Sequence, residues 1–171
     1  SIGIGGDSGV GKSTLIKMLP ICASNPTLWL DGENADVHQL LKNTNSERLK
    51  QLVGHHKVLV IDEAQKIENI GSILKLFADY IKGIQVIASG SSAFELRNSL
   101  NEPLTGRKFE FSLFPLSFSE MVRHTNLLQE IRQLPNRLVY GYYPEIVTHP
   151  QDAERLLKFL SDSYLYKEIF L

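Results

Sequence analysis

The sequence has one cysteine, no excess of charge of either sign and no long apolar run. Cys22 has no second cysteine to pair with, which excludes a secreted scaffold held together by internal disulfides. The 18 Lys and Arg residues balance 19 Asp and Glu residues, which argues against a protein built mainly to coat nucleic acid. The longest apolar runs, such as 58–61, fall far short of the ~20 residues that span a bilayer. We therefore expect no membrane partner.

The rest of the composition is that of a soluble α/β domain. With 171 residues, 43% of them hydrophobic, the chain is long enough for one domain with a real core. No signal or transit pattern opens it, so we expect a cytoplasmic protein. It begins at Ser1 within an apolar alternation and ends on apolar Ile169, Phe170 and Leu171. We expect a piece of a longer polypeptide, truncated at both ends, whose apolar end, with Leu165, contacts a second copy or a further C-terminal domain.

Apolar runs alternate with segments of helical period along the chain, which predicts a parallel sheet flanked by helices. Strands are expected over 1–5, 27–31, 57–62, 84–88 and 108–113. Helices are expected over about 11–22, over 35–52 as one or two short pieces, over 67–82, and from 150 onward. Two segments, Ser92 to Glu95 and Ser117 to Glu120, match the capping box that satisfies free amides at a helix start.

The segment Gly6-Asp7-Ser8-Gly9-Val10-Gly11-Lys12-Ser13 matches the phosphate-binding loop pattern, G-x-x-x-x-G-K-[ST], at every fixed position. Glycines let the backbone curl so that successive amides point at phosphate oxygens, and the following helix adds its positive dipole end. Lys12 is expected along the β- and γ-phosphates, with the Ser13 hydroxyl on Mg²⁺. The expected nucleotide-binding residues are Gly6, Asp7, Ser8, Gly9, Val10, Gly11, Lys12, Ser13 and Thr14.

The apolar strand 58–61 runs directly into two acids, Asp62 and Glu63. Such a strand delivers a carboxylate to the carboxyl edge of the sheet, where the phosphate loop also opens. Asp62 is expected to hold the Mg²⁺ shell, directly or through water, and the alternative is that it caps the next turn. Glu63 is expected to polarise the water that attacks the γ-phosphate. The two motifs together predict Mg-dependent ATP hydrolysis.

Together these residues resemble the P-loop ATPases of the AAA superfamily, in the branch with an acidic pair after the second motif. More narrowly, the chain is similar to a family of prokaryotic AAA-type ATPases over nearly its whole length. That resemblance also uses four further segments: Ala88-Ser89-Gly90-Ser91-Ser92, Leu104-Thr105-Gly106-Arg107, 114–120 and Gly141-Tyr142-Tyr143-Pro144-Glu145. Tyr142 departs from the Gly-Gly that the family more often has in the last one.

The resemblance implies a three-layer α/β fold, RecA- and AAA-like, with a parallel sheet of about five strands in the order 5-1-4-3-2 and C-terminal helices. Residues 1–171 then form one AAA-type domain, with a nucleotide-binding core over 1–122 and a helical extension over 123–171. Relatives often continue into a winged-helix-like and nuclease-like C-terminal portion. ATP is the implied substrate, and a homo-oligomer is the implied assembly.

Two catalytic roles follow from the resemblance alone. AAA-type sheets present a polar residue, sensor 1, on the strand beside the acidic one, and Ser89 and Ser91 are the candidates; the alternative is a turn that caps the next helix. AAA-type ATPases also place an arginine finger just before strand 108–113, and Arg107 holds that position. It would act on a neighbouring subunit's nucleotide. Its alternatives are pairing with Glu102 or Glu110, or simply starting the strand.

Other residues leave alternatives open or have simpler explanations. Trp29 is expected in the core. Asp31 and Glu33 end a strand at the edge where the phosphates bind, with either a turn role or contact with substrate or Mg²⁺. The tyrosines Tyr140, Tyr142 and Tyr143 have the chemistry to stack a nucleic-acid base or to pack under the C-terminal helix, so nucleic acid stays open as a partner.

Two other functions share the phosphate loop. A small-molecule or nucleoside kinase needs an acceptor site and usually an arginine-rich lid, and the seven arginines here are spread along the chain. A module that senses ATP as a slow switch needs no rapid turnover. A GTPase is disfavoured because the chain has no N-K-x-D or T-K-x-D segment to read guanine. The leading hypothesis is an ATPase whose hydrolysis drives a conformational change.

Overall fold

The structure, a computed structural model, describes residues 1–90 and 109–169, with side chains described up to residue 162. The predictions for Ser91, for the Ser92 capping box and for Arg107 therefore lie outside the described residues, as do Phe170 and Leu171 of the apolar end, and the side chains of Leu165 and Ile169 are not among those described. The chain divides into two compact units. One comprises Ser1–Asp7 and Lys12–Leu113, and the other comprises Ser8–Gly11 and Phe114–Leu171.

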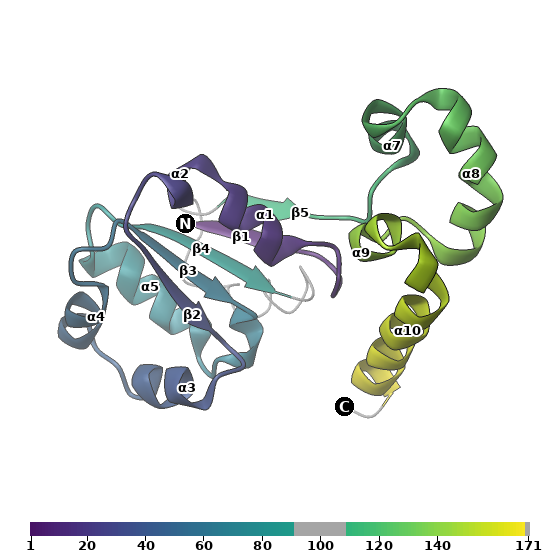
Figure 1. Cartoon of the computed structure of the whole chain (residues 1–171). Coiled ribbons are helices and arrows are strands. Elements are labelled where there is room, and N and C mark those ends of the chain that lie inside the picture. The colour runs from purple at the N-terminus through teal and green to yellow at the C-terminus, as the bar shows by residue number, and fades with distance from the viewer. Residues whose placement is uncertain (91–108, 170–171) are drawn as a thin grey trace. The chain divides into compact units, whose positions relative to one another are not determined.

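The first unit contains a five-stranded parallel sheet (Figure 1). Its strands are β1 (Ile2–Gly5), β2 (Thr27–Asp31), β3 (Val58–Asp62), β4 (Gln85–Gly90) and β5 (Phe109–Ser112). Their order is β2-β3-β4-β1-β5, which confirms the predicted 5-1-4-3-2 order read from the opposite edge. β3, β4 and β1 therefore lie in the middle of the sheet, and their carboxyl ends meet at one edge.

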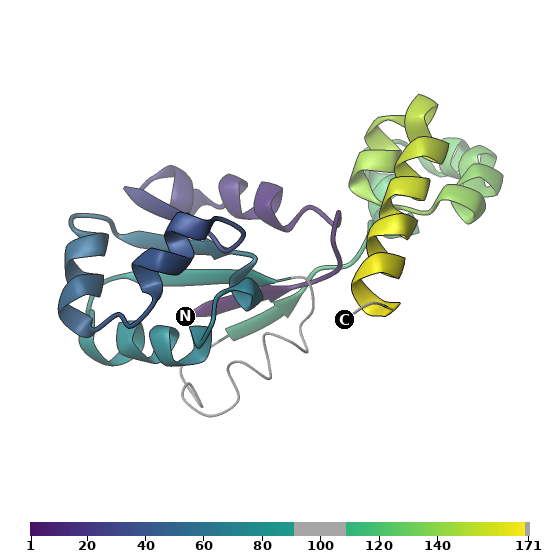
Figure 2. The ribbon, with the colours of Figure 1, turned by 90° about the horizontal axis from the view of Figure 1, so that it is seen from below.

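Helices cover both faces of this sheet, so the predicted three-layer α/β architecture is confirmed (Figures 1 and 2). The helices α1 (Lys12–Met18) and α2 (Pro20–Ala23) lie on one face. The helices α3 (Ala35–Leu41), α4 (Ser46–Val53) and α5 (Ile70–Tyr80) lie on the other. Between β3 and α5 the chain forms a short 3-10 helix, η1 (Ala64–Lys66).

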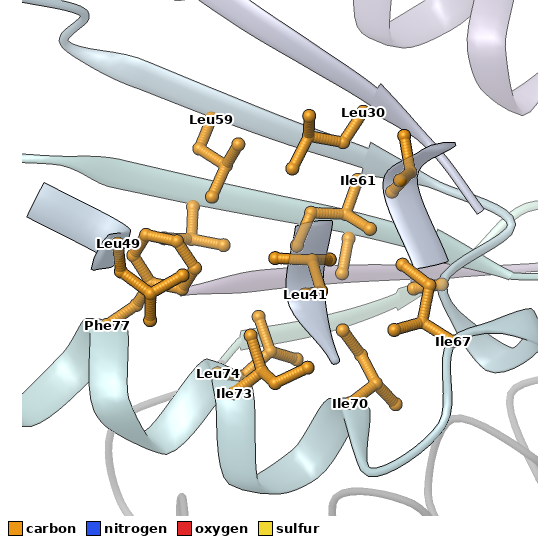
Figure 3. Close-up of a cluster of buried hydrophobic side chains, with 14 of the residues drawn as sticks. Leu30, Leu41, Leu49, Leu59, Ile61, Ile67, Ile70, Ile73, Leu74 and Phe77 are labelled. Atoms are coloured by element: carbon orange, nitrogen blue, oxygen red, sulfur yellow. The ribbon is translucent and has the colours of Figure 1, made fainter. Parts of the chain in front are cut away.

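Alternate side chains of β3 point to opposite faces of the sheet and contribute to a hydrophobic cluster on each face. Leu59 and Ile61 point to the larger cluster, where they meet Leu74 and Phe77 of α5 (Figure 3). Val58 and Val60 point to the opposite face and pack with Ile4, Ile16 and Ile87. All four apolar side chains of β3 are fully buried. This explains why the strand reads as a continuous apolar run, since a parallel sheet has no solvent-facing side here.

Two helices differ from their predicted extents, and each difference has a local cause. The helix expected over 11–22 is split into α1 and α2 because Leu19, which precedes Pro20, is extended with φ −62° and ψ 130°; proline disfavours a helical residue before it. The helix expected over 67–82 begins only at Ile70, because Asn69 is left-handed with φ 56°. Ile67 is nevertheless buried with the α5 residues.

The second unit is helical over its C-terminal part. It contains α7 (Phe118–His124), α8 (Leu127–Tyr140), α9 (Pro144–Thr148), a 3-10 turn (Pro150–Asp152) and α10 (Ala153–Ile169). Its small core is formed by Ile146, Ala153 and Leu160, with Tyr140 and Tyr143 packed against it. The predicted boundary between core and extension, at residues 122 and 123, falls inside α7 and stays a prediction. Among the described helices, none has the length and apolarity needed to cross a bilayer.

A buried ion pair lies on α8 of this unit. Glu130 is 1% exposed and accepts hydrogen bonds from the Arg137 guanidinium at 3.4 and 3.5 Å. The same guanidinium lies 5.5 Å from the ring centroid of Tyr142. Burial and the Glu130 carboxylate raise the pKa of the Tyr142 phenol. Tyr142, the residue that departs from the family pattern, therefore has a definite place here, as an aromatic cover over Arg137.

Candidate nucleotide-binding site

The glycine loop follows β1 and turns through two left-handed residues. Gly9 has φ 82° and Gly11 has φ 90°, conformations that side chains with a Cβ adopt only with strain. α1 begins at the next residue, Lys12. The glycines of the motif are thus explained by backbone geometry, since they let the chain reverse between strand and helix within a few residues.

Lys12 is a buried lysine, with 5% of its surface exposed. Its ammonium donates hydrogen bonds to the carbonyl oxygens of Gly6 at 2.8 Å and Asp7 at 3.0 Å. A buried ammonium needs such acceptors, because an unpaired one would be costly to desolvate. The side chain therefore lies along its own loop, with its charge held at the start of α1.

The carboxylate of Asp62 receives two serine hydroxyls from different elements. Ser13 on α1 donates to Asp62 Oδ2 at 2.5 Å, and Ser89 on β4 donates to Oδ1. Ser89 is fully buried. Since Ile61 pairs with Ala88, Asp62 and Ser89 follow at adjacent places in the register, where side chains share a face of the sheet. The structure thus brings together Ser13, Asp62 and Ser89, residues separated by up to 76 positions in sequence.

Glu63 leaves the strand in a left-handed conformation, with φ 47° and ψ 44°. This region is uncommon for residues with a side chain and costs of order 1–3 kcal/mol. Its amide donates to Asp62 Oδ1 at 3.2 Å. Its own carboxylate oxygen Oε2 accepts a hydrogen bond from Gln65 Nε2 at 2.7 Å. Sequence reasoning missed Gln65, and the signal for it is a polar side chain two residues after an acid in a tight turn.

The turn after β2 packs directly against Glu63. The Gly32 amide donates to the Asp62 carbonyl at 2.8 Å, and a Cβ at Gly32 would overlap the carbonyl oxygen of Glu63. Asp31 Oδ1 accepts from the Glu33 amide at 2.9 Å. Of the two roles considered for Asp31, the structure therefore shows the turn role. Glycine at position 32 is required by this close approach of two backbones.

An open groove of about 680 Å³ lies beside Asp62. Its walls include Lys17, Trp29, Asp31 and Asn34. Trp29 is 36% exposed, so its predicted place in the core is wrong. Trp29 lies on the edge strand β2. The Lys17 ammonium lies over the Trp29 ring, 5.8 Å from the ring centroid.

The donors at Asp62 are oxygens, which suit a hard cation. In the part of the chain that the structure describes, no group of three or more His, Cys, Asp and Glu residues could hold a metal by itself. Mg²⁺ commonly binds through one or two protein oxygens, with phosphate oxygens and water completing its octahedron. Ser13 and Asp62, with side-chain oxygens 2.5 Å apart, fit that pattern.

Comparison with known families assigns the chain. A sequence model of the AAA domain family matches residues 1–122, which is 122 of the 171 residues. This chain belongs to the AAA domain family. The AAA domain is a P-loop ATPase domain, so a nucleoside triphosphate is the ligand class of this site. The predicted AAA superfamily is thus confirmed.

Among solved structures, this AAA domain is similar to the Holliday junction branch migration motor RuvB of Thermotoga maritima, at 14% sequence identity and a TM-score of 0.49. The match covers 79% of this chain and 43% of the RuvB chain. The chain thus spans less than half the length of that protein. No curated protein matches the chain.

Proposed function

We propose that this AAA domain binds Mg²⁺ and ATP and hydrolyses the γ-phosphate, and that hydrolysis drives a conformational change in a larger protein or assembly. The observation that carries the proposal is the meeting of Ser13 and Ser89 at the Asp62 carboxylate. Ser13 directly follows the buried Lys12, and Asp62 directly precedes Glu63. These are the positions that a phosphate, its cation and an attacking water require.

The residues of the loop bind and hold the triphosphate. The residues 6–14 surround the phosphates, with backbone amides as donors. Lys12 holds its ammonium on neutral carbonyls, and phosphate oxygens are stronger acceptors for a cation. Ser13 and Asp62 would hold Mg²⁺, which supplies charge neutralisation on the β- and γ-phosphates.

Glu63 acts as the general base. It takes a proton from a water molecule, whose oxygen bonds to the γ-phosphorus. The bond from that phosphorus to the bridging oxygen breaks, and ADP leaves with the electron pair. Ser89 keeps one oxygen of Asp62 in place and takes the sensor role. Arg107, outside the described residues, would stabilise the charge of a neighbouring subunit's transition state.

The test is ATP hydrolysis without any acceptor molecule. Wild type should release phosphate, and a chelator should stop turnover while leaving the melting temperature unchanged. Glu63→Gln should keep ATP binding and lower hydrolysis by ~10² or more, the scale of a lost general base. Glu68→Gln, at an exposed carboxylate of the same connection, is the matched control and should hydrolyse normally. Normal hydrolysis by Glu63→Gln would refute the role of Glu63.

The groove beside Asp62 favours one alternative, a P-loop kinase. Its walls offer an aromatic ring, carboxylates and an amide, the kind of surface that holds an acceptor hydroxyl near the phosphates. A kinase should be nearly silent in the acceptor-free assay and consume ATP only when small-molecule or nucleoside acceptors are added. Tight binding with slow turnover under both conditions would instead indicate an ATP-sensing switch.

A further inference from the structure

Glu63 has a rigid backbone. Its left-handed φ and ψ are held from both sides. Its carbonyl accepts the Lys66 amide at 2.9 Å, and Gly32 packs against the same carbonyl with no room for a side chain. The Cα–Cβ direction of Glu63 is therefore fixed by the fold. The remaining freedom lies in the three side-chain torsions, which position the carboxylate.

Gln65 constrains that remaining freedom. It lies in η1, whose first residue, Ala64, is fully buried and whose following residue, Ile67, is 4% exposed. The Ile67 amide donates to the Ala64 carbonyl at 3.1 Å. This anchored turn aims the Gln65 amide back at the acid, and Nε2 donates to Glu63 Oε2 at 2.7 Å. The donor is thus carried by a part of the chain that is itself fixed to the core.

We propose that Gln65 is the positioning residue of the catalytic glutamate, a claim that rests on the hydrolysis proposed above. A carboxylate has two oxygens with lone pairs for several donors. The Gln65 amide holds Oε2, and this bond orients Oε1 to accept the proton of the attacking water. A long, flexible glutamate side chain otherwise loses rotamer entropy when it is ordered, and Gln65 supplies that order before ATP arrives.

A purely structural role for Gln65 makes different predictions. If its amide only stabilised η1, its loss would lower the melting temperature and disturb Asp62, which precedes the same turn. ATP affinity would then change together with the rate. A positioning role changes kcat alone, because Gln65 is not among the expected nucleotide-binding residues and the turn keeps its buried anchors.

The experiment replaces Gln65 by Met, which has a similar length and no amide. We expect kcat to fall roughly 10- to 100-fold, the range for a lost hydrogen bond to a charged group, with KM for ATP and the melting temperature unchanged. Lys66→Met, at an exposed position of the same turn, is the control and should keep kcat. Gln65→Leu, which also lacks the amide donor and adds no charge, should behave like Gln65→Met and serves if the latter does not fold.

A double-mutant cycle with Glu63 decides the mechanism. In the Glu63→Gln background, measured by single-turnover release of radiolabelled phosphate, Gln65→Met should cause no further loss, because residues that act as a unit are not additive. An undiminished kcat in Gln65→Met, an equal loss in both backgrounds, or a loss that follows the melting temperature would each overturn the positioning role. Absence of hydrolysis in wild type would instead overturn the proposed function, and this inference with it.

Discussion

Asp62 accepts two hydroxyl hydrogen bonds, so its two oxygens have separate environments. Oδ2 is shared with Ser13, the residue that would join it in the cation shell. Oδ1 receives Ser89 and the Glu63 amide. The carboxylate is therefore oriented by three elements: β3, which carries it, β4 and α1. Such fixed orientation is what a Mg²⁺ site with few protein ligands requires, since the protein must place those few accurately.

Lys12 gives the first residue-scale prediction. Lys12→Ala removes the one ammonium that the loop itself positions, so ATP affinity should fall about 10- to 100-fold, as expected for charge-assisted hydrogen bonds. Isothermal titration with Mg-ATP measures it. Lys75→Ala, at an exposed lysine on α5, should bind normally. Equal affinity of wild type and Lys12→Ala would contradict the assigned role.

The buried ion pair of Glu130 and Arg137 on α8 leads to a second prediction at the residue scale. Arg137→Met leaves Glu130, 1% exposed, without its cation, and breaking a buried pair from one side costs about 3 kcal/mol or more. Urea unfolding should show this loss. The double variant Glu130→Leu with Arg137→Met removes both charges and should recover most of the stability. A single variant as stable as wild type would show that the pair contributes little.

At this scale the sequence predicted identities better than orientations. The motifs named Lys12, Ser13, Asp62 and Glu63, and the family resemblance named Ser89 beside Ser91. The sequence could not predict that Gln65 turns back onto Glu63, because this depends on the left-handed residue between strand and turn. The sequence also misplaced Trp29 in the core. An apolar strand does not reveal which of its two faces stays exposed because the helix beside it is short.

At the scale of elements, strands were predicted more closely than helices. β2 has the predicted bounds, and β3 begins one residue later than expected, because apolar runs between turn residues delimit strands sharply. Helix ends depend on single residues such as Pro20 and Asn69, whose effects are local and conformational. α8 was expected only as part of a helical extension, and its interior Pro135 is a residue that disfavours a helix.

The capping box at the start of α7 was predicted from Ser117 and Glu120 and is confirmed. The Ser117 hydroxyl accepts from the Glu120 amide at 3.2 Å, and the Glu120 carboxylate accepts from the Ser117 amide at 2.8 Å. Ser117→Ala should lower stability by ~1 kcal/mol, the usual cost of a lost cap. Ser117→Thr keeps a hydroxyl and should lose little. Thermal unfolding that ranks both variants alike would contradict the cap.

The same box makes stability depend on pH. Hydrogen bonds from the Ser117 amide and hydroxyl lower the pKa of Glu120. A group whose pKa is lowered by folding stabilises the fold above its unfolded pKa, and the contribution is lost as pH falls through the folded value. The difference in melting temperature between wild type and Glu120→Ala should therefore shrink on acidification below the ordinary range of glutamate. A difference that grows under acid would have the wrong sign.

At the scale of the whole molecule, the strand order fixes where each functional group can lie. β5 lies at the edge of the sheet, with β1 and β4 between it and β3. Its first residue, Phe109, pairs with Ile2 at the amino end of β1, whereas Asp62 ends β3 at the carboxyl edge. The resemblance predicted this strand order correctly, because a parallel sheet with helices on both faces permits few strand orders. The sequence alone could not supply the packing of the C-terminal helices.

This topology frames the last prediction, which concerns assembly. Arg107 lies two residues before Phe109 in the sequence, outside the described residues, and we propose that it acts on the nucleotide of a neighbouring copy. Arginine fingers supply ~10³–10⁵ in rate in other phosphoryl transferases. Arg107→Ala and Glu63→Gln should therefore each be nearly inactive alone, although both should still bind ATP.

Mixing the two variants tests whether the arginine crosses between subunits. In a mixed assembly, some sites combine an intact Glu63 with the intact Arg107 of a neighbour, so part of the hydrolysis should return. The control mixes Glu63→Gln with Lys12→Ala. Here Lys12 and Glu63 serve the same site of one chain, so every site lacks one of them and no activity should return. No recovery in an Arg107→Ala mixture that co-assembles by light scattering, or a fully active Arg107→Ala monomer, would show that Arg107 is no finger in trans. Recovery in the first mixture and not in the second is the pattern that only a shared site produces.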